Sequence, residues 1–208
     1  MADIVAVTLL RHGITKANLE RRYLGWTDIP LLESEIQKLK AVQRFGLQFD
    51  YCVTSDLQRA KRTAEMLCPQ LEKLETRAFR ELHFGEWEMK TYDDLKSNLD
   101  YRAWIDAPES ITPPGGESFQ AMKERVDAGF EQLRVTVLEH GIRNILLVAH
   151  GGVIRYLLTK LTTEDKQFFE WSVSHDAGIR LIWEIDNWKG GGKCISFQEV
   201  PLMAREDG

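Results

Sequence analysis

Two short apolar runs, at residues 4–10 and 144–149, constrain the fold of this chain more than any other feature. A nearly continuous apolar run rich in β-branched residues is typical of a strand that is covered on both faces, as in a parallel sheet flanked by helices. Longer amphipathic stretches alternate with such runs along the chain, which is the pattern of an α/β fold. The sequence therefore predicts an α/β protein built as a three-layer α/β/α sandwich.

The same patterns predict the remaining elements. Further strands are expected at residues 51–54, 77–82, 179–185 and 194–200, with a turn at 187–192 between the last two. Helices are expected at residues 33–45, 56–67, 92–104, 117–139 and 153–161. Prolines and glycines gather at residues 107–118, but a long helix follows directly, so no domain boundary is expected there. We expect one domain over residues 1–208, with a lid-like excursion at about residues 85–120.

The composition excludes several classes of protein. The chain has 208 residues, of which 43% are hydrophobic and 28% are charged, an ordinary balance for a globular protein. The net charge of -5 excludes the broad basic surface of a nucleic-acid-binding protein, so a local cluster of arginines would have to hold any anionic substrate. The three cysteines are far apart and form no CxxC pair, which is typical of a reduced, intracellular protein.

The N-terminal segment carries an acid before its first base, unlike a signal peptide. The apolar runs also fall far short of the ~20 residues that a membrane-spanning helix needs. We therefore expect a cytoplasmic protein that binds neither nucleic acid nor membrane, and we leave a homodimer open.

Two of the predicted strands end in the same dipeptide, His-Gly, at residues 12–13 and 150–151. Ligands of open α/β sheets bind at the carboxyl ends of the strands, and a glycine there lets the backbone approach a ligand closely. A single histidine in this place would most simply form a hydrogen bond at the end of its strand. Two matched histidines with an adjacent arginine, Arg11, favour a catalytic site.

Other catalytic motifs are absent from the sequence. It has no HExxH zinc motif, no GxxxxGK[ST] phosphate loop and no GxSxG elbow after a strand. A cysteine phosphatase needs a shorter spacing than the six residues that separate Cys52 from Arg59. Histidine chemistry remains as the interpretation of the site.

Six ordered blocks make the chain similar to a known family. They are LRHG at residues 10–13, RYLGWTD at 22–28, TSDLQRA at 54–60, ELHFGEWE at 81–88, GGES at 115–118 and VAHGG at 148–152. In this order, and over most of the chain, they resemble the histidine phosphatase superfamily, whose fold is phosphoglycerate mutase-like. The resemblance implies one histidine phosphatase domain that acts on a small phosphorylated substrate.

The resemblance also implies roles for five residues. His12 is the expected nucleophile that forms a phosphohistidine, which suits an imidazole because its ordinary pKa lies near pH 7. Arg11 and Arg59 are expected to clamp the phosphoryl oxygens, since a guanidinium presents paired donors that match phosphate. His150 would stabilise the equatorial oxygens during transfer. Glu81 would donate a proton to the leaving alcohol and later take one from water.

Further residues are assigned to phosphate binding, and some assignments have alternatives. The expected phosphate-binding residues besides the catalytic five are Gly13, Thr15, Asn18, Arg22, Gly25 and Gly151. Arg22 could instead pair with a neighbouring acid, and Glu86 and Glu88 are alternatives to Glu81 as the proton donor. Trp104 is a candidate for the substrate entrance. Three other histidines are expected to be structural or exposed; they are His83, His140 and His175.

The chain departs from the family pattern at three places. Ile14 stands where many relatives carry glutamate. Met89 stands where a glycine often ends the turn, so the loop after Glu81 is expected to differ in course. The segment at residues 90–114 is shorter than the basic insertion of phosphoglycerate mutases and holds only three bases. Because a second phosphate would need its own cations, this segment favours a phosphatase over a mutase.

The hypothesis from the sequence is a metal-independent phosphomonoesterase of the histidine acid phosphatase type. It would need no cofactor and would hydrolyse small phosphate esters through a phosphohistidine on His12, with arginines and histidines supplying the positive charge that Mg²⁺ supplies elsewhere. Two alternatives stay open: a phosphoglycerate mutase, and a catalytically inactive phosphate-binding or interaction module. The natural substrate also stays open among sugar phosphates, phosphoglycerates, α-ribazole phosphate and nucleotide-like esters.

Overall fold

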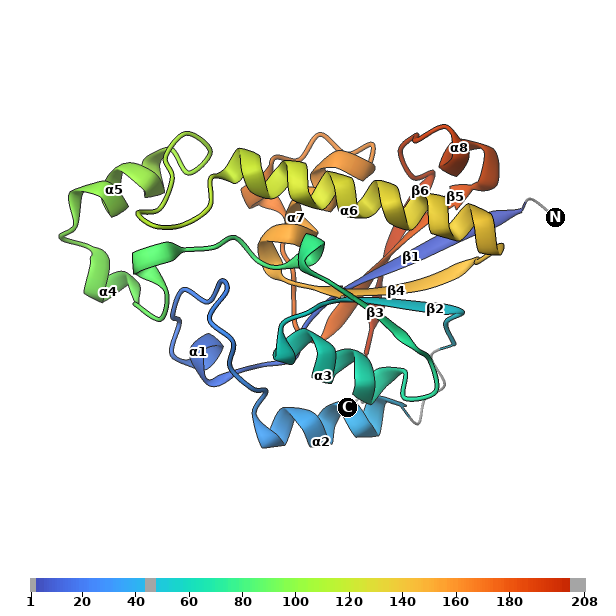
Figure 1. The fold of residues 1–208 in the computed structure, drawn as a ribbon, viewed down its shortest axis with the longest axis horizontal. Coiled ribbons are helices and arrows are strands. Elements are labelled where there is room, and N and C mark those ends of the chain that lie inside the picture. Colours follow the sequence, from blue (N-terminus) through green and yellow to red (C-terminus); the bar gives the residue numbers. More distant parts are fainter. Residues whose placement is uncertain (1–2, 44–47, 203–208) are drawn as a thin grey trace, which may run out of the picture.

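The computed structural model, which describes residues 3–43 and 48–202, contains a mixed six-stranded sheet (Figure 1). The strand order is β3-β2-β4-β1-β5-β6. The first four strands of this order run parallel to one another, whereas β5 is antiparallel to both of its neighbours. The strands are β1 (Ile4–Arg11), β2 (Tyr51–Ser55), β3 (Lys73–Thr76), β4 (Asn144–Ala149), β5 (Ala177–Glu184) and β6 (Ser196–Pro201).

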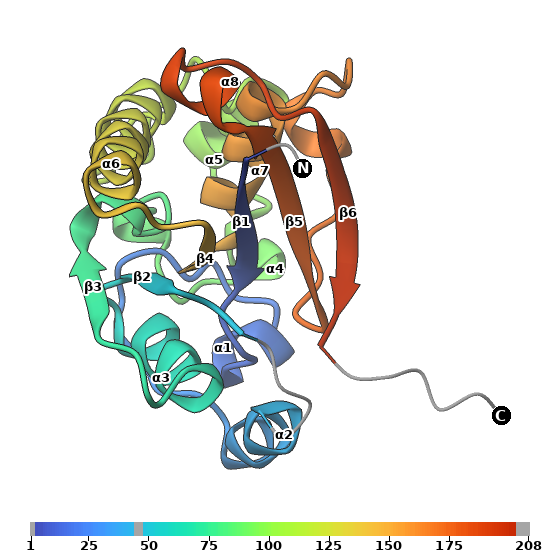
Figure 2. The ribbon, with the colours of Figure 1, turned by 90° about the vertical axis from the view of Figure 1, so that its right-hand side faces the viewer.

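Helices cover both faces of the sheet, which confirms the predicted α/β/α sandwich (Figure 2). One face carries α2 (Glu33–Gln43) and α3 (Gln58–Leu67). The other face carries α6 (Phe119–His140), α7 (Gly151–Leu161) and α8 (Ile185–Lys189). Three short helices lie beyond the carboxyl ends of the parallel strands (Figure 1); they are α1 (Lys16–Leu19), α4 (Tyr92–Leu95) and α5 (Leu99–Asp106).

Successive residues of the central strands face opposite helical layers, as the period of two in a β-strand requires. Leu9 and Leu147 belong to the core that includes α6 and α7. Leu10 and Val148, one residue further along each strand, belong to the core that includes α2 and α3. All four side chains are buried. Burial on both faces explains why these strands are continuous apolar runs in the sequence.

Most predicted strands and helices are confirmed, and two predictions are wrong. Residues 77–82 are not a strand: Arg77–Phe79 forms a 3₁₀ helix, and the strand β3 lies just before it. The predicted helix at 92–104 is two helices, because Thr91 and Asn98 each accept a hydrogen bond from a backbone N–H three residues on and so begin a new helix.

The remaining differences are small. The predicted turn at 187–192 begins inside the short helix α8. Residues 44–45 of the helix predicted at 33–45 lie outside the described residues. Among the described residues, no helix is both long and apolar enough to cross a bilayer.

The aromatic side chains of α4, α5 and the loop before them form a small core of their own beside the sheet. Trp87, Leu95 and Tyr101 are buried there, with Tyr23 and Trp104 packed against them. The ring planes of Trp87 and Tyr101 meet nearly at right angles, with centroids 5.4 Å apart. This second core holds the excursion at about residues 85–120 in place next to the carboxyl ends of the strands.

Met89, which stands where a glycine often ends the turn in the family pattern, has an unusual backbone conformation. Its φ of 62° lies in the left-handed region, which costs a non-glycine residue about 1 kcal/mol. Its backbone N–H donates to the carbonyl of Tyr23 at 2.8 Å, and its own carbonyl accepts a hydrogen bond from Arg22 Nη1 at 2.7 Å. The methionine is therefore held by neighbours in a conformation that glycine would adopt freely.

Candidate active site

Parallel pairing of β1 and β4 brings the two His-Gly dipeptides together. Arg11 lies opposite Ala149 in the ladder, and the backbone N–H of His12 donates to the carbonyl of Ala149 at 3.0 Å. His150 directly precedes α7 as its N-cap. The imidazole centroids of His12 and His150 are consequently 5.0 Å apart. One ligand of phosphate size can therefore touch both rings.

The His12 ring has a defined orientation. Its Nδ1 lies 2.7 Å from the carbonyl oxygen of Gly13, and because a carbonyl only accepts, Nδ1 carries the proton. Nε2 is then the nitrogen with a free electron pair. The ring is buried, and burial together with the Arg59 charge holds the pKa of His12 well below its ordinary value. The side chain is thus a neutral imidazole with Nε2 available for attack.

Arg59 lies on the first turn of α3 and is completely buried. Its Nε donates to His12 Nε2 at 3.3 Å, and its two Nη groups donate to the carbonyls of Thr27 (3.0 Å) and Gly25 (2.6 Å). Burial lowers the pKa of Arg59 to about 10, which leaves it charged at neutral pH. The side chain is a buried cation without a salt bridge among the described residues.

Glu88 fixes the loop that orients Arg59. Its carboxylate accepts hydrogen bonds from the backbone N–H groups of Gly25 (3.1 Å), Trp26 (2.8 Å) and Thr27 (3.0 Å). A fourth N–H, that of Phe84, donates to it at 3.1 Å. Gly25 therefore contacts Arg59 through its carbonyl, and Glu88 acts on the arginine through this loop.

Arg11 and His150 have buried polar atoms without partners in the described part of the chain. These atoms are Arg11 Nε and both ring nitrogens of His150. Arg11 Nη1 donates to the carbonyl of Val173 at 3.2 Å, and the guanidinium lies against Gly151. Buried polar groups are nearly always hydrogen-bonded, so these atoms are available to a ligand rich in acceptors. A phosphoryl group has the charge and the oxygens to satisfy them.

His150 is neutral in this setting. The ring is 1% exposed, and burial, followed by the charge of Arg59, holds the pKa of His150 well below its ordinary value. Burial also lowers the pKa of Arg11. A dianionic ligand would reverse the effect of the arginines on the histidine by adding opposite charge beside it.

Glu81 is held beside the first turn of α7. Its Oε2 accepts the backbone N–H of Gly152 at 2.9 Å, and Oε1 accepts that of Leu82 at 3.0 Å. A Cβ at position 152 would lie 2.3 Å from Oε1, so the close approach requires glycine there. The Glu81 carbonyl is fixed in turn by Trp26 Nε1 at 2.8 Å.

The three candidate glutamates have separate places. Glu81 is the one of the three that lines the cavity described below, Glu86 is exposed, and Glu88 is occupied by four backbone N–H groups. The structure thus distinguishes among carboxylates that the sequence left open.

Four of the predicted phosphate-binding residues have partners within the protein. Thr15 and Asn18 form a capping box that begins α1, with Asn18 Oδ1 accepting from the Thr15 backbone N–H at 3.0 Å. Arg22 pairs with Glu20 at 2.5 Å, which is the alternative considered for it. The Gly13 N–H donates to Thr63 Oγ1 at 2.9 Å. Gly151 lies against the Arg11 guanidinium, where a Cβ would be 3.5 Å from its carbon.

His175 is a site residue that the sequence reasoning missed. Its Nδ1 lies 2.6 Å from the carbonyl oxygen of His12, and the two imidazole centroids are 5.5 Å apart. Burial, followed by the charge of Arg11, lowers the pKa of His175 to about 4. No motif marks this residue. It reaches the site because β5 is antiparallel to β1, so the segment before β5 meets the end of β1.

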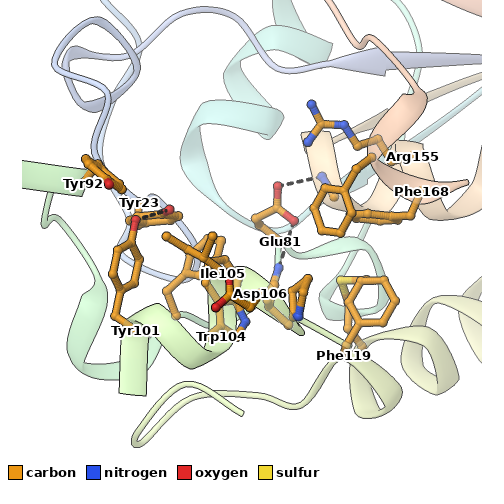
Figure 3. A pocket seen from close by; sticks show the side chains of 16 residues that line it. Tyr23, Glu81, Tyr92, Tyr101, Trp104, Ile105, Asp106, Phe119, Arg155 and Phe168 are labelled. Carbon is orange, nitrogen blue, oxygen red and sulfur yellow. Dashed lines mark hydrogen bonds between the residues drawn. The ribbon is translucent and has the colours of Figure 1, made fainter. Parts of the chain in front are cut away.

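A cavity of about 690 Å³ opens next to Glu81 and Gly152 (Figure 3). Half of its lining residues are aromatic, and most of these aromatic residues come from the excursion and from the segment after α7. The aromatic lining residues are Tyr23, Phe84, Tyr92, Tyr101, Trp104, Phe119, Phe168 and Phe169. Trp104 thus lines the cavity, as the sequence suggested. Among the described residues, no cluster of three or more His, Cys, Asp or Glu side chains is arranged to hold a metal ion.

The architecture is the phosphoglycerate mutase-like α/β fold. The chain superposes on the crystal structure of the alpha-ribazole phosphatase from Shigella flexneri with a TM-score of 0.77 and 29% identity, covering 85% of this chain and 90% of that one. Residues 7–191 match the histidine phosphatase superfamily (branch 1), and the chain belongs to this family.

Relatives of two kinds are similar to the chain. It is 33% identical over 159 residues to the adenosylcobalamin/alpha-ribazole phosphatase of Escherichia coli, covering 74% of this chain and 77% of that protein. It is 34% identical over 171 residues to 2,3-bisphosphoglycerate-dependent phosphoglycerate mutase 2 of Gloeobacter violaceus, covering 74% of each. The chain is therefore an enzyme of the phosphatase or mutase kind.

Proposed function

We propose that this enzyme is a metal-independent phosphomonoesterase that hydrolyses small phosphate esters through a phosphohistidine on His12. The observation that carries the proposal is the set of buried, unpartnered donors on Arg11 and His150 around the available Nε2 of His12. A phosphoryl group placed there would satisfy those donors and present its phosphorus to the nucleophile. Arg59, which now donates to Nε2 at 3.3 Å, would turn this N–H toward a phosphoryl oxygen.

In the first step, the electron pair of His12 Nε2 attacks phosphorus, and the bond from phosphorus to the ester oxygen breaks. The ring becomes cationic, and its Nδ1–H to Gly13 hydrogen bond stabilises that charge. Protonated Glu81 gives its proton to the departing alcohol oxygen. Positioning and electrostatic stabilisation by the arginines and His150 supply the remaining effect, as in phosphoryl transfer generally.

In the second step, water enters where the alcohol was. Glu81, now a carboxylate, takes a proton from the water as its oxygen attacks phosphorus. The bond from Nε2 to phosphorus breaks, and neutral His12 and inorganic phosphate remain. The second step thus returns Glu81 to its protonated form and His12 to its neutral form.

The lining of the cavity supports a phosphatase over the mutase alternative. Its described lining residues include a single cation, Arg155. The three bases of the 90–114 segment do not line it, and Lys96 is paired with Asp93. A bisphosphorylated intermediate would need several charge-assisted donors for its second phosphate. The apolar walls favour an alcohol with a ring, for which α-ribazole phosphate is one candidate by relationship.

The test uses phenyl phosphate with purified protein in the presence of a chelator. We expect turnover, a base-stable and acid-labile phosphoenzyme from radiolabelled substrate, and loss of both in His12→Ala by at least roughly 10⁴-fold. His140→Ala, on the exposed end of α6, is the matched control and should retain activity. Activity that His12→Ala retains, or that the chelator abolishes and Mg²⁺ restores, would refute the proposal.

The mutase alternative is tested separately with 3-phosphoglycerate and a trace of 2,3-bisphosphoglycerate. Release of phosphate as the faster reaction supports a phosphatase. Conversion to 2-phosphoglycerate that outruns phosphate release would show that the mutase is the main activity. Tight phosphate binding without turnover of any ester would instead favour the inactive binding module.

A further inference from the structure

Arg155 is the one cation among the described residues that line the aromatic cavity. It lies on α7, one helical turn after Gly151, which lies against Arg11. Its Nε donates to the carbonyl of Trp171 at 3.0 Å, which holds the side chain beside the segment of Phe168 and Phe169. In Figure 3 its guanidinium and Phe168 lie on the same side of Glu81.

Arg155 has no acidic partner among the residues that the structure describes. Two other half-buried arginines are paired with carboxylates: Arg80 with Asp56 at 2.6 Å and Arg125 with Glu117 at 2.7 Å. The Nη groups of Arg155 form no salt bridge and no hydrogen bond within the described residues. A guanidinium that is partly removed from water without a counterion stabilises an anion that enters beside it.

The acids of the cavity do not serve as this counterion. Both oxygens of Glu81 already accept backbone N–H groups, and no Glu81 oxygen lies within salt-bridge distance of Arg155. Asp106, at the end of α5, is exposed and comes from another wall of the cavity. The described residues of the cavity therefore supply no carboxylate that pairs with Arg155.

We propose that the cavity binds phosphate esters whose alcohol carries a flat ring and, on that ring, a carboxylate that pairs with Arg155. Aromatic walls stack on the ring, and the planar guanidinium matches a carboxylate with two parallel hydrogen bonds. One guanidinium suffices for a carboxylate, whereas a second phosphate would need more donors. The inference rests on the proposed function, because Glu81 marks where the ester oxygen lies.

The test compares two matched substrates, para-carboxyphenyl phosphate and para-carbamoylphenyl phosphate, which have the same shape but differ in charge. For the unaltered enzyme we expect kcat/KM to favour the carboxylate by about tenfold or more, the factor of one charge-assisted hydrogen bond. In Arg155→Met the preference should disappear, while phenyl phosphate turnover changes less than about threefold, because that substrate makes no use of the pair. Comparing the ratio between variants cancels the different leaving-group reactivities.

Two further variants control for charge and shape. Lys160→Met removes a cation from the same helix outside the cavity and should keep the preference. Arg155→Lys should keep part of the preference for the carboxylate, since the positive charge remains but the paired donors of the guanidinium are lost. No preference in the unaltered enzyme, or one that survives in Arg155→Met, overturns the inference. An equal loss on phenyl phosphate also overturns it, because Arg155 would then act on the phosphoryl group.

A binding measurement separates this inference from the proposed function. Calorimetry with para-hydroxybenzoate and para-hydroxybenzamide needs no turnover. Tighter binding of the carboxylate, lost in Arg155→Met, supports the specificity of the cavity even if no ester is hydrolysed. Equal binding of the two compounds by an enzyme that turns over phenyl phosphate leaves the phosphatase intact and refutes the role of Arg155.

Discussion

The phosphate end of the site and the aromatic cavity are built from different kinds of sequence. At the phosphate end, Arg11, His12 and His150 come from contiguous blocks at the ends of two paired strands, next to glycines. The aromatic side chains of the cavity come from several separate segments between Tyr23 and Phe169, and they do not share a single motif. The phosphoryl group is the same in every ester, so its donors are fixed by the sheet. The alcohol varies, and its walls come from segments that the sheet does not constrain.

Glu81 stands between the two regions, so its replacement has the largest effect that depends on the alcohol. Glu81→Gln should lower kcat about 10²- to 10³-fold on alkyl phosphates, which need a proton on the leaving oxygen. On para-nitrophenyl phosphate the loss should be less than about tenfold, because that leaving group departs without protonation.

The exposed Glu86, five residues on, supplies the control variant Glu86→Gln, which should behave like the unaltered enzyme. If Glu81→Gln lowers kcat equally on alkyl phosphates and on para-nitrophenyl phosphate, Glu81 acts on the phosphoryl group and not on the leaving alcohol.

Variants of His175 test the phosphate end of the site. His175→Ala removes the donor to the His12 carbonyl and should lower kcat about tenfold for every ester with little change in KM. His175→Asn keeps an N–H donor in a similar place and should recover most of the loss. Steady-state kinetics and the rate of phosphoenzyme formation measure both effects. If His175→Ala unfolds like the unaltered enzyme but forms the phosphoenzyme slowly, His175 does more than stabilise the fold. If phosphoenzyme formation is unchanged, the positioning role is wrong.

A variant of Phe169 tests the aromatic cavity. The side chain is 59% exposed at the mouth of the cavity, so its loss should leave the fold intact. Phe169→Ser should raise KM for naphthyl phosphate about three- to fivefold through lost apolar contact, without changing the turnover of ethyl phosphate. Leu19→Ser, which removes an exposed apolar side chain outside the cavity, should change neither value.

The smallest expected effect is on stability as a function of pH, and it belongs to the phosphate end. His175 has a folded-state pKa of about 4 against an ordinary 6.5, and the pKa values of His12 and His150 are also lowered. Between pH 6.5 and 4 the unfolded chain binds more protons, so stability falls as pH falls through this window.

Urea unfolding at a series of pH values measures this slope. His175→Asn should reduce it by up to about 1.4 kcal/mol per pH unit, the value for one proton. In the cavity, burial raises the pKa of Tyr23, so this group does not titrate in that window. An unchanged slope in the variant would contradict the buried, neutral state of His175.

The sequence predicted the central strands well because β1 and β4 are covered on both faces, which leaves an apolar run that is easy to find. It failed at β3, an edge strand with mostly exposed or half-buried residues and no apolar run. The neighbouring Arg77, Ala78 and Phe79 have a more strand-like alternation but form a 3₁₀ helix. The break at Asn98 could have been found from its capping side chain.

For the site, the five residues implied by the family resemblance lie at or next to the carboxyl ends of the parallel strands. The resemblance gave no role for His175 or Arg155, and it did not show what Glu88 does. His175 depends on the direction of β5, and Arg155 depends on how the segment after α7 folds back. Glu88 appeared in the sequence as a rival acid, and only its four backbone donors show that it orients a loop. Such roles depend on contacts between distant segments, which residue patterns do not contain.

The antiparallel course of β5 also determines how much of the chain a working site requires. Every motif residue lies before residue 153, yet the carbonyl of Val173 holds Arg11, and His175 holds the carbonyl of His12. A fragment that ended after α7 would keep the nucleophile and both arginines but would lack one side of their support. Residues 162–202 thus support the nucleophile from outside the motifs, so a substitution there can change the setting of His12 without altering a motif residue.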